Sequence, residues 1–260
     1  MSLGSSAVQQ SCPGEAQLPY SLKKLVLLHL VPGVAILVFY LALVPLARSH
    51  GWPPFLALQL AALFGIVPIQ LGHLFLAGRK LNHRLSLVGV LGNNSKLPKW
   101  QYFAFVPLLC LIAIIILLAT APIDGWLTRT VFAWLPSWYF YSNPAVFVSF
   151  PRRILEITFG ARILIDGLMV PFVEELYFRA YLLARLDRFG GWAPLINGGL
   201  FTLYHFWQPQ NYPTIFLSIF PMVWLTWCKK NYRLAMLTHM TLNLIGGLLT
   251  YSLVVGNRPM

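Results

Sequence analysis

The amino-acid sequence predicts an all-α bundle of helices that crosses a membrane several times. Hydrophobic residues make up 58% of the 260-residue chain and charged residues only 10%, whereas soluble domains average roughly 45–50% and 25%. Apolar runs of about 20 residues, the length that a helix needs to cross the hydrocarbon layer, recur along the chain. A backbone in hydrocarbon must satisfy its own hydrogen bonds, and this favours helices.

The first half of the chain contains three long apolar runs, at residues 25–46, 55–77 and 102–121. Prolines fall inside each of them, but neighbouring helices or water can satisfy the carbonyls that a proline frees within a membrane helix. A polar tail over residues 1–22 precedes the first run. We expect this tail to lie outside the membrane and the three runs to cross it.

The later spans are more interrupted. We expect them at 163–183, 192–207, 214–228 and 234–255, and residues 131–150 form either an eighth span or an interfacial segment. Seven spans with the N-terminus inside place most of the 19 Lys and Arg on the inner side, as the positive-inside rule requires. An eighth span would reverse the later helices and weaken that bias, so seven is the preferred count.

The net charge and the distribution of polar residues indicate where the chain contacts lipid and where its chemistry is expected. The net charge of +12 predicts attraction to anionic lipid headgroups, and we expect no nucleic-acid partner because no soluble basic module is present. Residues 23–162 hold ordinary apolar helices, whereas polar residues inside helices concentrate in residues 163–250. Any chemistry is therefore expected in 163–250.

Two adjacent carboxylates, Glu174 and Glu175, stand in an apolar run. An ionised carboxylate in hydrocarbon costs several kcal/mol unless it is paired, solvated or protonated. Glu175 and Arg179 are four residues apart and share one face of a helix, so they can pair. Glu174 is turned about 100° from Glu175 and needs a different partner.

Further polar residues follow on the later helices. His205 lies four residues after Phe201, and His239 and Asn243 stand one turn apart on the last span. Taken singly, an intramembrane histidine is more often a helix–helix hydrogen bond than a catalyst, and the pair of Glu175 with Arg179 can be purely structural. A transporter or proton relay, and a membrane scaffold without catalysis, are therefore alternatives to an enzyme.

As an ordered set, these residues resemble a known family. The strings EELYFR at 174–179, FTLYH at 201–205 and HMTLN at 239–243 are similar to the EExxxR, FxxxH and HxxxN signatures of the CaaX protease and bacteriocin-processing family of intramembrane endopeptidases. The resemblance covers roughly residues 163–250. Ala180 departs from the glycine that many relatives carry there, and this affects packing rather than chemistry.

The resemblance implies roles for the motif residues. Glu174 and His205 would hold and activate a water molecule, and His239 with Asn243 would stabilise the oxyanion. Glu175 and Arg179 would brace the first motif helix. Peptide hydrolysis needs a nucleophilic water, a group to take its proton and donors for the oxyanion, so the resemblance implies an intramembrane endopeptidase with a glutamate-activated water, to which no cofactor is assigned.

A zinc enzyme is the alternative mechanism, with Glu174, His205 and His239 as ligands and an open position for water. The glutamate mechanism is preferred because no HExxH helix occurs and Asn243 is a poor zinc ligand. The expected substrate is a membrane-associated protein or peptide, which is lipidated for some family members. We expect a multi-pass protein of a bacterial cytoplasmic membrane in preference to the endoplasmic reticulum.

Helix length gives an estimate of how deep each motif residue lies in the membrane, and this estimate supports convergence only in part. Counted along straight spans, Glu174 and His205 lie near the middle of the membrane, whereas His239 lies only about 8 Å from the inner end of the last span. On this estimate His239 would not reach Glu174. The expectation that all three residues converge therefore depends on the resemblance.

Overall fold

The computed structural model describes residues 20–141 and 144–256. Helices account for most of these residues, and no β-strand occurs among them, which confirms the predicted all-α bundle. Residues 1–19 of the polar tail lie outside the described residues, as do residues 257–260.

Three long helical runs form the first half of the chain. They agree with the predicted apolar runs and extend each by several residues. Their bounds are α1 Leu22–Ser49, a continuous run of α2 Pro54–Ala61, the π-helix η2 Ala62–Ile66 and α3 Val67–Asn82, and then α4 Lys99–Arg129.

The second half begins with a helical run that changes its winding several times. A 3₁₀ segment then leads to three further helices. The elements are α5 Arg152–Leu164, the π-helix η5 Ile165–Met169, α6 Val170–Glu174, the π-helix η6 Glu175–Leu182, the 3₁₀ segment η7 Leu183–Trp192, α7 Ala193–Tyr204, η8 Pro209–Asn211, α8 Tyr212–Lys229, α9 Tyr232–Tyr251 and η9 Ser252–Gly256.

Within the described residues, four helices are long and apolar enough to cross a membrane, namely Leu22–Ser49, Pro54–Asn82, Lys99–Arg129 and Tyr232–Gly256. The seven predicted spans are therefore supported only in part, and their number stays a prediction. The described part of residues 131–150 holds two short 3₁₀ segments, Ser137–Tyr139 and Pro144–Phe147. Neither is long enough to be an eighth span.

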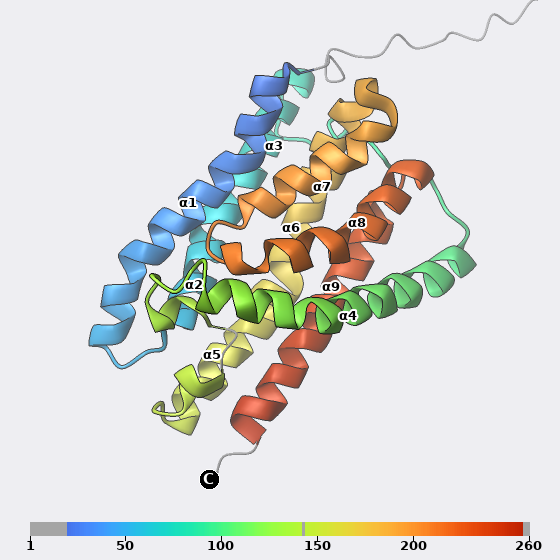
Figure 1. The fold of residues 1–260 in the computed structure, drawn as a ribbon. Helices are drawn as coiled ribbons and strands as arrows, with labels where there is room; N and C mark the ends of the chain where they lie inside the picture. The colour runs from blue at the N-terminus through green and yellow to red at the C-terminus, as the bar shows by residue number, and fades with distance from the viewer. Residues whose placement is uncertain (1–19, 142–143, 257–260) are drawn as a thin grey trace, which may run out of the picture.

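The run that carries the two glutamates lies in the middle of the bundle. In Figure 1, α6 runs between α1 on one side and α9 on the other, while α4 lies across them and packs on α8 and α9. All eight residues of η6 are buried. Glu175 and Arg179 therefore belong to the protein interior and not to a lipid-facing surface.

Groups outside η6 donate hydrogen bonds to the backbone carbonyls of its wide turns. Four consecutive carbonyls, those of residues 178–181, accept hydrogen bonds from a side chain or a loop. The donors are Asn197 Nδ2 to Phe178 O (3.0 Å), Asn93 Nδ2 to Arg179 O (2.9 Å), Gly92 N to Ala180 O (2.7 Å) and Arg185 Nη1 to Tyr181 O (2.7 Å). Unpaired backbone groups are costly when buried, so these donors stabilise the local geometry of the segment.

Helices α1 and α7 approach closely at a glycine. A Cβ atom added to Gly33 would lie 2.1 Å from the carbonyl oxygen of Tyr204, a backbone atom that cannot move independently of α7. A residue without a side chain is therefore needed where α1 meets the last turn of α7.

We expect the substitution Gly33→Ala to lower the free energy of unfolding by about 1–3 kcal/mol, because the added methyl group must push α1 away from α7. Gly72→Ala in α3 is the matched control, since a Cβ there would meet no atom within 4 Å. Thermal unfolding of both variants in detergent measures the difference. Equal stability of the two variants would contradict the close approach.

Candidate functional site

Glu174 ends α6 and Glu175 begins η6, and the two residues as a whole are 3% and 0% exposed. The helix that carries them includes Pro171, which lacks the N–H that an α-helix would use at this position. The π-helix η5 ends at Met169, two residues before that proline, and its wider turn accommodates the missing hydrogen bond. Local sequence thus shapes the segment that brings both carboxylates into the bundle.

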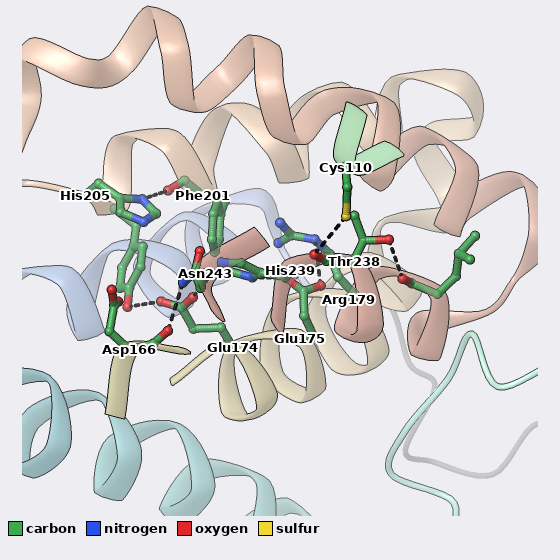
Figure 2. Close-up of polar contacts among 12 residues, drawn as sticks. Cys110, Asp166, Glu174, Glu175, Arg179, Phe201, His205, Thr238, His239 and Asn243 are labelled. Atoms are coloured by element: carbon green, nitrogen blue, oxygen red, sulfur yellow. Dashed lines mark hydrogen bonds and ion pairs between the residues drawn. The ribbon is translucent and has the colours of Figure 1, made fainter. Parts of the chain in front are cut away.

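Glu175 has two cationic or basic partners. Its Oε2 lies 3.3 Å from Nε of Arg179, and both side chains are fully buried, so the predicted pair is present. Its Oε1 lies 2.9 Å from Nδ1 of His239 on α9, a contact that the sequence did not indicate. The carboxylate therefore links η6 to α9, and both of its oxygens have partners (Figure 2).

The guanidinium of Arg179 also contacts the second motif. Its Cζ atom lies 4.2 Å from the ring centroid of Phe201 on α7. This is a cation–π arrangement, which is stronger when the cation is removed from water. Phe201, the first residue of the FTLYH motif, therefore packs against Arg179 of the first motif.

Glu174 has different neighbours. The Tyr204 hydroxyl donates to its Oε1 at 2.8 Å, and its Oε2 lies 4.0 Å from Nε2 of His239. Tyr204 stands inside the FTLYH motif but was not predicted as a site residue. The signal available in the sequence was a tyrosine in an apolar helix, whose hydroxyl requires a partner when it is buried.

His205 is the residue that follows α7. Its Nδ1 lies 2.8 Å from the carbonyl oxygen of Phe201. A carbonyl only accepts hydrogen bonds, so Nδ1 carries the proton and Nε2 is left as an acceptor in the neutral ring. The ring packs between Tyr204 and Trp207, with centroid distances of 4.9 Å and 4.8 Å. Among the described residues, neither a hydrogen bond nor an ion pair joins His205 to Glu174.

Asn243 lies on α9 one turn beyond His239. Its Nδ2 donates to the backbone carbonyl of Asp166 in η5 at 2.9 Å. The Asp166 side chain is 38% exposed and lies 3.6 Å from Nε of Arg162, whereas the side chains of Glu174 and His239 are 4% and 14% exposed. Exposure therefore increases from Glu174 towards Asp166.

The predicted site residues come from three parts of the bundle and form one cluster. Figure 2 shows Glu174 and Glu175 facing His239, with Asn243 beside Asp166, and with His205 and Phe201 above them. The inference that His239 would not reach Glu174 is wrong. Nε2 of His239 lies 4.0 Å from Oε2 of Glu174, because α9 packs directly against α6 and η6.

The zinc alternative finds no complete ligand set among the described residues. Nε2 of His239 lies 4.0 Å from Oε2 of Glu174, and Nδ1 of His205 donates to the Phe201 carbonyl, so only Nε2 of the His205 ring could bind a metal. Within the part of the chain that the structure describes, no group of three His, Cys, Asp or Glu side chains could hold a metal ion. As arranged, Glu174, His205 and His239 do not form a zinc ligand set.

Comparison with known proteins adds independent information. Residues 157–245, about a third of the chain, match the family model described as type II CAAX prenyl endopeptidase Rce1-like. No curated protein and no solved structure matched the chain. The matched segment starts in α5, ends in α9 and contains all three motifs. This segment is therefore similar to the CaaX protease and bacteriocin-processing family, as the three motifs predicted.

Proposed function

We propose that the protein is an intramembrane endopeptidase in which Glu174 acts as the general base towards a water molecule. The observation that carries this proposal is the difference between the two buried glutamates. Oε1 of Glu175 lies 2.9 Å from His239 Nδ1 and its Oε2 forms an ion pair with Arg179 at 3.3 Å, whereas Glu174 accepts from Tyr204 at Oε1 and has its Oε2 4.0 Å from His239 Nε2. Glu174 is therefore the carboxylate with one oxygen left to accept from a water molecule.

The neighbours of Glu174 supply the remaining functions. The water oxygen would attack the peptide carbonyl carbon while Glu174 takes one proton from the water. Glu174 would then pass this proton to the leaving nitrogen as the C–N bond breaks. Nε2 of His205 is an acceptor that can orient the water. A His239 ring protonated at both nitrogens would donate from Nε2 to the oxyanion, with the amide of Asn243 as a second donor.

Glu175 and Arg179 act as positioning residues in this proposal. Glu175 accepts from Nδ1 of His239 and thereby directs Nε2 of that ring towards Glu174. Arg179 holds Glu175 and packs on Phe201. The family implies a membrane-associated protein as substrate, and we propose that the scissile bond reaches Glu174 from the more exposed side, near Asp166.

Glu174→Gln is expected to lower the rate of proteolysis by about 10²–10⁴-fold, because an amide cannot take the proton from water. Protein termini would be compared in membranes that contain the wild type or the variant. Glu156→Gln is the matched control on the same helical run, since its carboxylate is 40% exposed and pairs with Arg152. Termini produced equally by wild type and Glu174→Gln would exclude Glu174 as the base.

Phenanthroline and other zinc chelators are expected to leave the proteolysis of wild-type membranes unchanged, because no group of three potential ligands among the described residues is placed to hold a metal ion. The measurement is the rate at which new termini appear with and without chelator. Loss of activity that added Zn²⁺ restores would favour the metal mechanism instead.

Arg179→Gln is expected to reduce the free energy of unfolding by about 3–5 kcal/mol, because it removes the buried guanidinium that pairs with Oε2 of Glu175. Arg152→Gln removes an exposed pair with Glu156 and should cost less than about 1 kcal/mol. Unfolding of both variants in mixed detergent compares these costs. Similar stabilities would show that the Arg179 pair is not important to the fold.

A further inference from the structure

We propose that Tyr204 is the positioning residue that holds the general base, a role that the three motifs do not assign. This inference rests on the proposed function of Glu174. The Tyr204 hydroxyl donates to Glu174 Oε1 at 2.8 Å, across a separation of 30 residues in the sequence. The tyrosine is fully buried and the glutamate is 3% exposed. A hydrogen bond to a carboxylate in such surroundings is stronger than one between neutral groups.

The position of Tyr204 is itself tightly determined. Its carbonyl oxygen is the atom that Gly33 of α1 approaches, so the backbone is fixed against another helix. Its ring packs on Phe178 at a centroid distance of 5.0 Å and on Trp207 at 5.2 Å. The hydroxyl therefore has little freedom, and it can restrict the carboxylate of Glu174 to one orientation.

As a consequence, the two oxygens of Glu174 have different roles in the proposed reaction. Oε1 is occupied by Tyr204, and Oε2, the oxygen that lies 4.0 Å from His239 Nε2, is left to accept the proton of the water. His205 is the next residue after Tyr204, so the same turn that fixes the carboxylate also places the imidazole acceptor. The geometry needed for proton transfer is thus set before substrate binds.

The chain offers a matched control in Tyr177. This tyrosine is 1% exposed, and its hydroxyl donates at 2.9 Å to the backbone carbonyl of Leu28. Tyr204→Phe and Tyr177→Phe each remove one buried hydroxyl that donates to an oxygen. Only the first removes a hydrogen bond to the general base, so a general effect on the fold should be similar in both variants.

The kinetic test uses a fluorogenic peptide that spans the cleavage site found by comparing termini from wild-type and Glu174→Gln membranes. We expect Tyr204→Phe to lower kcat about tenfold or more with little change in KM, because a charge-assisted hydrogen bond at the base is lost. Tyr177→Phe should retain kcat. Equal kcat values for these two variants, with Glu174→Gln still inactive, would overturn the role of Tyr204 and leave the proposed function intact.

A second measurement needs no substrate. The chain contains only seven Asp and Glu residues, so the infrared band of the Glu174 carboxyl group can be identified by its loss in Glu174→Gln. We expect Tyr204→Phe to shift this band and Tyr177→Phe to leave it in place. An unshifted band in Tyr204→Phe would refute the hydrogen bond. If wild type produces no termini beyond those of Glu174→Gln, the proposed function fails, and the catalytic role of Tyr204 fails with it.

Discussion

The arrangement of this protein depends on the cost of burying two adjacent carboxylates in an apolar bundle. Each oxygen removed from water must find a donor or a cation, or the fold loses several kcal/mol. Glu175 is served by Arg179 on its own helix and by His239 on α9, and Glu174 by Tyr204 on α7. The partners come from three helices, so satisfying the two carboxylates also holds η6, α7 and α9 together.

The same constraint explains why the two glutamates differ in their surroundings. Glu175 lies between a guanidinium and an imidazole. Glu174 accepts from a neutral hydroxyl at one oxygen and has its other oxygen 4.0 Å from His239. The distinction arises because the side chains of neighbouring residues on a helix point in different directions. Glu174 and Glu175 therefore meet different helices although they are adjacent in the chain.

The first half of the chain contributes to the site without supplying motif residues. Gly33 allows α1 to contact the backbone of Tyr204, and Asn93 donates to the carbonyl of Arg179. His29 on α1 contacts Asn197, whose amide donates to the carbonyl of Phe178. The division at residues 162 and 163 stays a prediction about where the chemistry lies, since both parts pack into one bundle.

By itself, the sequence determined the helical class, the positions of the long apolar helices, the pairing of Glu175 with Arg179 and the family that residues 157–245 resemble. These features depend on local composition or on spacings within one helix turn, and the pattern of residues expresses them directly. Tertiary structure alone decided that Tyr204 donates to Glu174, that His239 reaches Glu175, and that Asn243 is directed to the Asp166 carbonyl. Those contacts join residues 30 to 77 positions apart. They follow from helix packing and from the wide π-helical turns. The spacing of residues along one helix predicts neither of these.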